Sequence, residues 1–282
     1  KKIRQYRIRK LVVDPVMAAK GGSRLLREEA RETLIGELIP LAAVVTPNIP
    51  EAEALTGMRI SRKSDMRKAA VRIHELGAKN VVVKGGHLEG DAADLLFDGK
   101  GFHEFAVKRI DTKHTHGTGC TFASAIATGL AQGAGVHESV KRAKDYVTEA
   151  IRFGLAIGGG QGPTNHFAPV FREGERWRCI EELKQAVTRL KGARTGNIVP
   201  EIQSNFGYAL PGASSAAEVA AVPGRIIRVG ENVETLHDPD FGASSHVAKV
   251  ILAVMRFDDR YRSAMNIRFS EEILRVLEAL RF

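Results

Sequence analysis

The sequence contains few cysteines, few aromatic residues and no long hydrophobic run. Two cysteines among 282 residues exclude a disulfide framework and a four-thiolate metal site, so we expect a reducing, cytoplasmic compartment. No apolar run approaches the roughly 20 residues of a membrane-spanning helix, and we therefore expect no association with a membrane. We find no internal repeat and no low-complexity tract. A GxxxxGK(S/T) motif is also absent, which excludes a P-loop kinase.

Positive charge is in excess, but the sequence does not gather it into a nucleic-acid-binding surface. Lys and Arg number 42 against 33 Asp and Glu, which gives a formal net charge of +9. Six of the basic residues lie in the first ten positions, and the others are scattered without a stripe of interleaved aromatic residues. We therefore expect no nucleic-acid partner. A basic surface suits small phosphorylated substrates at least as well.

The first half of the chain alternates short apolar runs with helical segments. The runs Leu11–Val13, Ala43–Thr46 and Val81–Lys84 are rich in β-branched residues and predict buried strands. Strands that alternate with helices favour an α/β fold with a mostly parallel sheet flanked by helices. A hairpin is expected to start near Asp94. The segments expected to be helical are Arg24–Ile39, Ser64–Leu76, the stretch after Gly119, and His137–Gly154.

A second, smaller α/β domain is expected after a polar stretch. Residues 171–179 show no apolar periodicity and suggest a boundary near residue 175. The sequence accordingly predicts two domains, residues 1–174 and 178–282. The later part mixes turn residues with short apolar runs. It contains three segments expected to be helical, Ile180–Leu190, Ser245–Phe257 and Ser270–Leu280.

The most specific local signal is a glycine turn before a helix. Gly117, Thr118 and Gly119 lead directly into a helix whose first turn contains Cys120. Such a turn directs unpaired backbone N–H groups, and the positive end of the helix dipole, at one point. It predicts an anion hole suited to a phosphate in transfer. The alternative is a tight strand-to-helix turn with a small buried cysteine.

Two further segments of the first half carry candidate ligands. Asn48 and Glu51 stand three residues apart at a strand-to-helix junction, where such a pair can hold a hydrated Mg²⁺ that bridges phosphate oxygens. The alternative is a helix cap with a partner for the helix dipole in the first turn. Lys84 ends a strand and is followed by Gly85 and Gly86, where the backbone is expected to approach another group closely.

These motifs occur together in the order of a known family. The segments DPVM, TPNIPEAEALTG, VVVKGGH, HGTGCTFASAIA and GGGQGPTNH, within residues 11–168, resemble those of hydroxymethylpyrimidine and hydroxymethylpyrimidine-phosphate kinases, which have a ribokinase-like fold. The resemblance implies ATP-dependent phosphorylation of the pyrimidine part of thiamine in two successive steps. It also implies that an N-terminal part of the kinase domain, which binds the pyrimidine, is missing from this chain.

The same resemblance implies roles for individual residues. Gly117, Thr118 and Gly119 would form the anion hole, and Cys120 would act as the base on the substrate hydroxyl. The implied Mg²⁺ ligands are Asn48, Glu51 and Asp14. The residues implied to lie beside the nucleotide are Lys84, Gly85, Gly86, His87, Gly160 and Gly162.

The second half offers two candidate anion sites. Arg225 follows a Pro-Gly turn at the start of a short strand, where a fixed guanidinium could bind a phosphate. Ser244, Ser245 and His246 follow a glycine at the start of a helix, where amides, hydroxyls and an imidazole would converge on an anion. The alternative makes Ser244 a helix cap and His246 a surface residue.

A second resemblance covers residues 180–282. The segments PEIQSNFGYALPGA, VAAVPGRI, FGASSHVAKVIL and RSAMNIRFSEEIL resemble the ThiN-type thiamine-phosphate synthase domain, whose C-terminal side is expected to be incomplete here. It implies that hydroxymethylpyrimidine diphosphate and thiazole phosphate are joined with loss of pyrophosphate. Arg225 and His246 would bind the diphosphate and assist its departure. Further candidates for substrate binding are Ser244, Ser245, Asn266 and Arg268, with a solvated ion pair as the alternative for the last.

Together the two resemblances predict a multifunctional transferase of thiamine biosynthesis that uses ATP and Mg²⁺. Its expected partners are small molecules, namely hydroxymethylpyrimidine, its phosphates and thiazole phosphate. A homodimer is expected because ribokinase-like kinases are commonly oligomeric. Two alternatives stay open. In the first, the C-terminal domain is a non-catalytic sensor that binds thiamine phosphate; in the second, the kinase acts on another ring alcohol such as pyridoxine.

Overall fold

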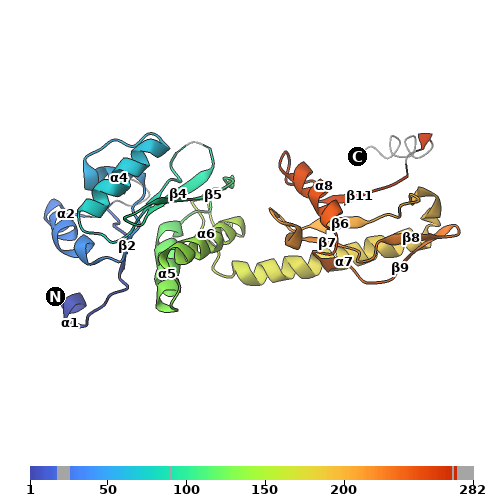
Figure 1. Ribbon diagram of the computed structural model, residues 1–282, viewed down its shortest axis with the longest axis horizontal. Helices are drawn as coiled ribbons and strands as arrows, with labels where there is room; N and C mark the ends of the chain where they lie inside the picture. Colours follow the sequence, from blue (N-terminus) through green and yellow to red (C-terminus); the bar gives the residue numbers. More distant parts are fainter. Residues whose placement is uncertain (18–25, 89, 269, 272–282) are drawn as a thin grey trace. The chain divides into compact units, whose positions relative to one another are not determined.

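The computed structural model describes residues 1–17, 26–88, 90–268 and 270–271, and the chain divides into two compact units (Figure 1). Unit 1 comprises Lys1–Pro169 and unit 2 comprises Val170–Phe282. No helix in the described part of the chain is long and apolar enough to cross a membrane. The predicted helix Ser270–Leu280 lies outside the described residues from residue 272 onward.

Unit 1 is built around a five-stranded sheet whose strands follow one another in chain order. They are β1 (Val12–Val13), β2 (Val44–Val45), β3 (Val81–Lys84), β4 (Ala92–Phe97) and β5 (Phe102–Val107). Strands β1, β2 and β3 are parallel, whereas β3, β4 and β5 pair in antiparallel fashion. The sheet is therefore mixed, and the predicted hairpin that includes Asp94 is its antiparallel edge.

Helices cover both faces of this sheet. Val81 and Val83 pack into a core shared with α3, α4 and residues 34–41, while Val82, between them, packs against α5 and α6. Figure 1 shows α2 and α4 on one side of the sheet and α5 and α6 on the other. This layering confirms the predicted α/β fold class. The helices are α1 (Lys2–Gln5), α2 (Glu28–Thr33), α3 (Ile49–Thr56), α4 (Lys63–Glu75), α5 (Thr118–Ala131) and α6 (Val136–Arg152).

The helix predicted over Arg24–Ile39 is interrupted. Its first two residues lie outside the described part of the chain, and α2 ends at Thr33. A π-helical turn, Leu34–Leu38, and a 3-10 turn, Ile39–Leu41, follow. Pro40 stands in the 3-10 turn and has no N–H to donate, so a regular helix cannot continue through it.

The polar stretch 171–179 is helical. Helix α7 runs from Ala168 to Gly192 and passes through this stretch. Arg178 pairs with Glu175 one turn earlier and with Glu182 one turn later, and such pairs support a helix that lacks an apolar pattern. The sequence shows no apolar pattern here because ion pairs replace the hydrophobic stripe, and the two compact units divide at the start of this helix, between Pro169 and Val170.

Unit 2 has a four-stranded antiparallel sheet in the order β10-β7-β6-β11 and a separate hairpin of β8 and β9. The sheet lies between helices α7 and α8 (Figure 1). The strands are β6 (Phe206–Ala209), β7 (Val219–Ala221), β8 (Ile226–Val229), β9 (Asn232–Thr235), β10 (Asp240–Phe241) and β11 (Ser263–Met265). The remaining elements are α8 (Ser245–Met255) and the 3-10 turns Thr195–Ile198 and Ala216–Glu218.

Helix α8 lies directly on strand β6 at Gly207. A Cβ atom at this position would lie 2.4 Å from Cγ1 of Val247 and 3.0 Å from Cδ1 of Ile251. Both of these side chains are buried in the core between α8 and the sheet. Only glycine therefore allows this close approach of helix and strand.

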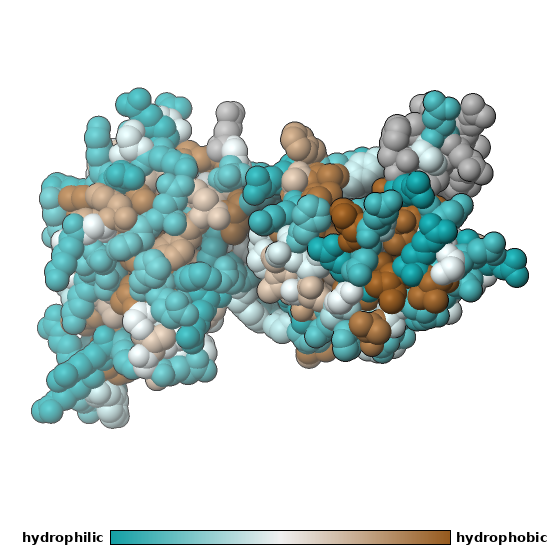
Figure 2. Space-filling model, turned by 45° about the vertical axis from the view of Figure 1, so that its right-hand side comes forward, coloured by the Kyte–Doolittle hydropathy of each residue, from teal (hydrophilic) through white to brown (hydrophobic). Residues whose placement is uncertain are grey.

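Exposed hydrophobic side chains also occur, but they do not mark a site. Figure 2 shows hydrophobic residues interspersed with hydrophilic ones on the visible face. Trp177 on α7 is 69% exposed and Leu236, after β9, is 72% exposed. Scattered apolar side chains of this kind are ordinary on protein surfaces.

Replacing Gly207 by alanine is expected to destabilise unit 2 by about 1–3 kcal/mol, because the added methyl group overpacks the contact with α8. Urea unfolding followed through Trp177, the single tryptophan of the sequence, would measure this loss. Gly174→Ala is the matched control. Gly174 lies on α7 with no atom within 4 Å of an added Cβ, so alanine should stabilise by about 0.5–1 kcal/mol. Equal effects of both changes would contradict the packing argument.

Candidate functional site

Three charged side chains meet where the parallel strands of unit 1 end. Lys84 Nζ donates to Asp14 Oδ1 over 2.7 Å and lies 3.9 Å from Glu51 Oε2. All three side chains are at most 15% exposed. The buried Thr46 hydroxyl donates to the same Asp14 oxygen over 3.1 Å. Asp14 follows β1, Glu51 lies in the helix after β2, and Lys84 ends β3, so the cluster occupies the edge of the sheet where α/β proteins bind ligands.

Asn48 and Glu51 form a reciprocal cap at the start of α3. Asn48 Oδ1 accepts from the Glu51 N–H over 2.9 Å, and Glu51 Oε2 accepts from the Asn48 N–H over 2.8 Å. The capping alternative considered from the sequence is thus present. Burial raises the pKa of the Glu51 carboxyl above its ordinary value, although the Lys84 ammonium and the Asn48 N–H oppose the rise. Glu51 therefore belongs both to the cap and to the charged cluster.

Helix α5 begins at the predicted glycine turn and faces this cluster. Gly117 is the N-cap, with a left-handed φ of 84°, and Thr118 starts the helix. A Cβ at Gly119 would lie 3.3 Å from Lys84 Nζ and 3.5 Å from Asp14 Oδ2. Among the described residues, no backbone acceptor pairs with the amides of Gly119 and Cys120. Unpaired N–H groups at the helix start thus lie beside the Lys84 ammonium, an arrangement suited to an anion.

Cys120 is exposed, so the alternative of a small buried cysteine at this turn was wrong. The residue lies in the first turn of α5, next to Gly119. Its thiol is therefore accessible to a ligand at the helix start.

The glycines after β3 serve two different purposes. A Cβ at Gly85 would lie 2.0 Å from the carbonyl oxygen of Ala93, so the close approach expected here is to strand β4. The Leu88 N–H donates to the Gly85 carbonyl over 3.0 Å and closes a four-residue turn. Gly86 and His87 form the exposed tip of this turn, and Gly86 faces open space.

The second glycine segment lies beside the start of α5. The His116 N–H donates to the Gly162 carbonyl over 3.1 Å, immediately before Gly117. Gly162 itself is tightly packed, because a Cβ there would lie 2.3 Å from Nδ1 of His114. Gly160 is exposed and has no neighbouring atom within 4 Å of an added Cβ. The described contacts thus bring Gly162, but not Gly160, to the edge of the site.

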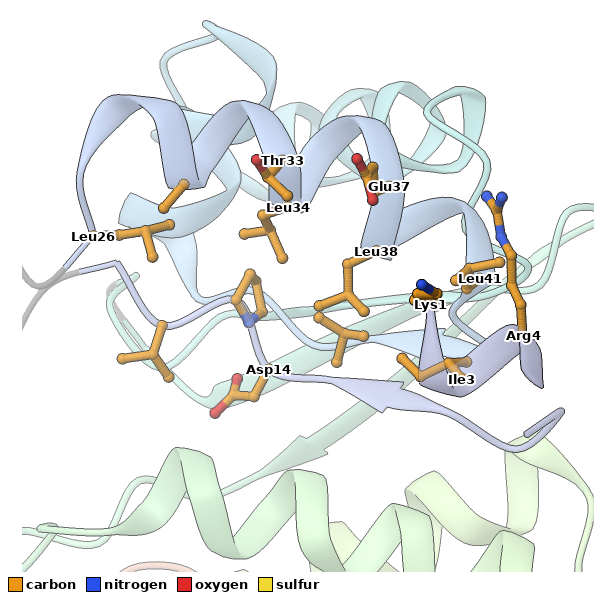
Figure 3. A pocket seen from close by; sticks show the side chains of 14 residues that line it. Lys1, Ile3, Arg4, Asp14, Leu26, Thr33, Leu34, Glu37, Leu38 and Leu41 are labelled. Carbon is orange, nitrogen blue, oxygen red and sulfur yellow. The ribbon is translucent and has the colours of Figure 1, made fainter. Parts of the chain in front are cut away.

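A cavity of about 770 Å³ adjoins the cluster. It is lined by α2 and the turns that follow it, by residues around β1, and by residues of α1. In Figure 3 the side chains of Leu34, Leu38 and Leu41 extend toward its interior, whereas the Asp14 carboxylate points away from them. We therefore assign the polar chemistry to the charged cluster rather than to this cavity.

In unit 2, three predicted site residues surround the segment 198–205. Arg225 Nη1 donates to the Ile202 carbonyl over 2.7 Å, which leaves most of the five guanidinium donors for other acceptors. Asn266 Nδ2 donates to the Gln203 carbonyl over 3.0 Å. The Arg268 backbone N–H donates to Ile198. Arg225, Asn266 and Arg268 are therefore neighbours of one loop.

The structure places Ser244, Ser245 and His246 elsewhere in unit 2. The Ser244 hydroxyl accepts from the Val247 N–H and caps α8, as the alternative interpretation predicted. Ser245 and His246 are exposed in the first turn of α8. The Gly242 N–H donates to Val219 at the start of β7, whereas Arg225 follows the end of that strand. No described contact joins His246 to Arg225.

Sequence reasoning missed several groups that shape these sites. Arg109 holds the turn after Lys84 through three carbonyls, and Asp94 pairs with Lys144 in the interior beside that turn. Gln203 and Arg225 both adopt left-handed φ values, 69° and 71°. Contacts to backbone carbonyls and positive φ at non-glycine residues leave no local signal in a sequence, so none of these was predictable.

Comparison with known proteins agrees with both resemblances. Residues 1–165 match the family model of phosphomethylpyrimidine kinase, and residues 182–282 match that of thiamine-phosphate synthase ThiN. The Geobacter sulfurreducens thiamine biosynthesis bifunctional protein ThiED is 58% identical over 166 residues, which cover 58% of this chain and 34% of that protein. The Bacillus subtilis hydroxymethylpyrimidine/phosphomethylpyrimidine kinase is 50% identical over 170 residues, covering 60% of this chain and 63% of the relative. The chain thus spans less than two thirds of either relative.

Solved structures show the same ribokinase-like fold for unit 1. An ADP complex of Bacillus subtilis pyridoxal kinase is similar with a TM-score of 0.55 and 38% identity, over 60% of this chain and 63% of that one. Staphylococcus aureus pyridoxal kinase in complex with AMP-PCP gives a TM-score of 0.55 and 36% identity, over 59% and 62% of the two chains. Because the kinase model matches more than half of the residues, the chain belongs to the phosphomethylpyrimidine kinase family.

Proposed function

We propose that unit 1 performs the phosphoryl transfer of a hydroxymethylpyrimidine and hydroxymethylpyrimidine-phosphate kinase. The observation that carries this proposal is the position of Lys84 and Asp14 against Gly119, at the unpaired amides of α5. A cation and a helix start that share one point favour the phosphates of ATP. The family and the AMP-PCP and ADP complexes of similar kinases support the same substrate.

The charged cluster also fits the Mg²⁺ that such a reaction needs. Asp14 Oδ2 and Glu51 Oε1 are the carboxylate oxygens that the interactions described above do not use. Asn48 Oδ1 caps α3, so we assign the metal to the two carboxylates and the nucleotide phosphates. Within the described residues no group of three or more His, Cys, Asp or Glu could hold a metal alone. Mg²⁺ bound with few protein ligands plus phosphates fits this set, and it supplies neutralisation of phosphate charge.

These positions support the following phosphoryl step. The hydroxymethyl oxygen of the pyrimidine attacks the γ-phosphorus and its bond to the β-γ bridging oxygen breaks, which releases ADP. The substrate hydroxyl proton passes to the Cys120 sulfur, which acts as the base. The amides of Gly119 and Cys120 receive the negative charge on the transferred group, and the Lys84 ammonium stabilises the phosphates.

Removing the Glu51 charge should raise the stability of the protein near neutral pH and weaken its binding of Mg²⁺. Because the folded-state pKa of Glu51 is raised, the folded protein binds its proton more readily than the unfolded chain. Ionisation of Glu51 therefore lowers stability as pH rises above about 4.5, the unperturbed value. Glu51→Gln should gain stability relative to the unmodified chain as pH rises from 4 to 7, measured by urea unfolding without Mg²⁺.

The same Glu51→Gln variant should bind Mg²⁺ in the presence of ATP at least about 10–100-fold more weakly, the loss that even an outer-shell partner causes. Isothermal titration with Mg²⁺ would measure it. Glu75→Gln, at the exposed end of α4, is the matched control and should change neither quantity. A Glu51→Gln protein that loses stability at pH 7 would show that the Lys84 ion pair outweighs the cost of burial.

Cys120→Ala should lower the kinase rate by about 10²–10⁴-fold while ATP affinity stays unchanged, because a general base acts on the proton and not on the nucleotide. The assay contains this chain, Mg²⁺, ATP and hydroxymethylpyrimidine, whose free hydroxyl is the group that loses a proton, with ADP release as the readout. A Cys120→Ala protein with the full rate would remove Cys120 from the mechanism.

A second substrate deserves a parallel assay, since the solved structures with TM-scores of 0.55 include pyridoxal kinases. Replacing the pyrimidine by pyridoxal tests the ring-alcohol alternative directly. The ratio of kcat/KM values for the two alcohols decides between them. We propose the pyrimidine because the relatives at 50–58% identity are named as a thiamine biosynthesis protein and a hydroxymethylpyrimidine/phosphomethylpyrimidine kinase.

We further propose that unit 2 joins hydroxymethylpyrimidine diphosphate to thiazole phosphate. The thiazole nitrogen bonds to the pyrimidine methylene carbon, and the bond from that carbon to the diphosphate oxygen breaks to release pyrophosphate. Arg225, fixed on the Ile202 carbonyl, is assigned to the departing diphosphate. Arg268 and Asn266 border the same loop, and His246 with Ser244 and Ser245 at the start of α8 is assigned to a second anionic group. The match of residues 182–282 to the ThiN family supports this activity.

Arg225→Gly should abolish thiamine phosphate formation without loss of stability. Arg225 has a left-handed φ of 71°, and glycine relieves strain that costs of order 1–3 kcal/mol. Arg194→Gly is the matched control. Arg194 also has a left-handed φ, 48°, and is exposed, so this variant should gain stability and keep its activity. Unfolding curves and an assay with preformed diphosphate, thiazole phosphate and Mg²⁺ supply both readouts.

The sensor alternative predicts a different pattern in that assay. A folded protein that binds thiamine phosphate but forms none from the two substrates would support a sensor and contradict the synthase. Formation of thiamine phosphate by the unmodified chain, with loss of this activity in Arg225→Gly, would exclude the sensor alternative.

A further inference from the structure

The turn Gly85–Leu88, which follows Lys84, is anchored from two sides by groups outside the charged cluster. It belongs to no helix or strand, and its only internal backbone hydrogen bond described is that from the Leu88 N–H to the Gly85 carbonyl. A turn with one such bond does not fix its own conformation. Its position must therefore come from neighbouring elements.

The first anchor is a buried ion pair. Asp94 Oδ1 accepts from the Gly85 N–H over 3.1 Å, and Asp94 Oδ2 accepts from Lys144 Nζ over 2.8 Å. Lys144 also donates to the Ala92 carbonyl over 2.8 Å, and the Asp94 and Lys144 side chains are only 9% and 10% exposed. Strand β4 and helix α6 thereby hold the base of the turn. Removing either charge would leave the other buried without a partner.

The second anchor is the guanidinium of Arg109, two residues beyond β5. It donates to the carbonyls of Gly86, Leu88 and Gly90 over 2.9, 2.6 and 3.0 Å. A planar group with fixed donors can bind three carbonyls only in one arrangement of the backbone. Arg109 therefore fixes the tip of the turn, where Gly86 faces open space.

We propose that Arg109, together with the Asp94–Lys144 pair, is a positioning residue that holds the Gly85–Leu88 turn in the conformation that receives the nucleotide. This proposal rests on the proposed kinase function of unit 1. Lys84 precedes the turn and reaches Gly119, so the turn begins at the site proposed for the phosphates. A turn ordered in advance does not have to be ordered when the nucleotide binds, and affinity is higher for that reason.

The test measures the dissociation constant of ATP for three arginine variants of the full chain. Arg109→Met should weaken ATP binding about tenfold, which corresponds to about 1.4 kcal/mol. Arg109→Lys keeps the charge but not the three-fold contact, so it should restore only part of the affinity. Arg142→Met is the matched control, because Arg142 is an exposed arginine of α6 whose described partner is Glu138, and it removes the same charge.

Amide hydrogen exchange of the nucleotide-free protein supplies a second readout. The Leu88 amide reports on the turn, because its hydrogen bond closes it. In Arg109→Lys this amide should exchange faster, with the rest of unit 1 unchanged, and ATP should restore its protection. A purely structural role in folding would instead change exchange and thermal stability throughout unit 1.

Three results would overturn the proposal. Unchanged ATP affinity in Arg109→Met would show that the anchor is irrelevant to the nucleotide. Full affinity in Arg109→Lys would assign the effect to charge alone. Absence of ATP binding in the unmodified chain would contradict the proposed kinase function and the role of Arg109 together. ATP binding that the Arg109 variants leave unchanged would contradict the role of Arg109 alone.

Asp94→Asn tests the buried anchor separately. Asparagine can still accept from the Gly85 N–H but no longer balances Lys144, so both ATP affinity and thermal stability should fall. If this variant does not fold, Lys144 is shown to need its partner, and the exposed Arg109 variants still decide the proposal. A folded Asp94→Asn protein with unchanged ATP affinity would confine the role to Arg109.

Discussion

The contact of the Lys84 ammonium with two carboxylates is the interaction on which the site of unit 1 depends. Asp14 follows β1, Glu51 lies in α3 and Lys84 ends β3, so one cation joins three elements. Burial, and repulsion by the Asp14 carboxylate in the same site, raise the pKa of the Glu51 carboxyl. The ammonium opposes this rise at Glu51. It therefore allows two acidic groups to occupy one cluster.

The same cation gives a reason for the second glycine of the motif, Gly119 in the first turn of α5. A side chain at Gly119 would meet Lys84 Nζ and Asp14 Oδ2 within 3.5 Å. Gly117 needs glycine for a different reason, its left-handed φ of 84°. Of the two glycines in this short motif, Gly119 leaves room for a contact between distant segments, and Gly117 provides a backbone conformation that other residues rarely adopt.

The sequence predicted what depends on local pattern. Buried β-branched runs identified β1, β2 and β3, and the glycine turn identified the start of α5. It could not reveal that Lys84 pairs with Asp14, because ion pairs between distant segments are formed by the fold. Nor could it reveal Arg109, whose acceptors are backbone carbonyls that every residue carries. Of helix α7 only the later part, Ile180–Leu190, was predicted, because ion pairs such as Arg178 with Glu175 support its earlier turns where an apolar stripe was sought.

In unit 2 the backbone gives the strongest argument for a role of Arg225. A left-handed φ at a non-glycine residue costs of order 1–3 kcal/mol, and it persists where the surroundings determine it. Here Ser204 and Ile226 exchange two backbone hydrogen bonds beside Arg225. Gly224, the preceding residue, has a similar φ of 73° and no such strain.

Strain alone does not mark a site, since Arg194 shares the left-handed conformation on the exposed surface. What distinguishes Arg225 is that its guanidinium is fixed on the Ile202 carbonyl, while Arg194 lies 3.7 Å from an equally exposed Glu231. An exposed surface pair of that kind contributes little to stability, and it does not orient the group. A fixed guanidinium on a strained backbone has its donors oriented before a ligand arrives. That orientation, which glycine cannot provide, is the physical reason to expect a phosphate at Arg225.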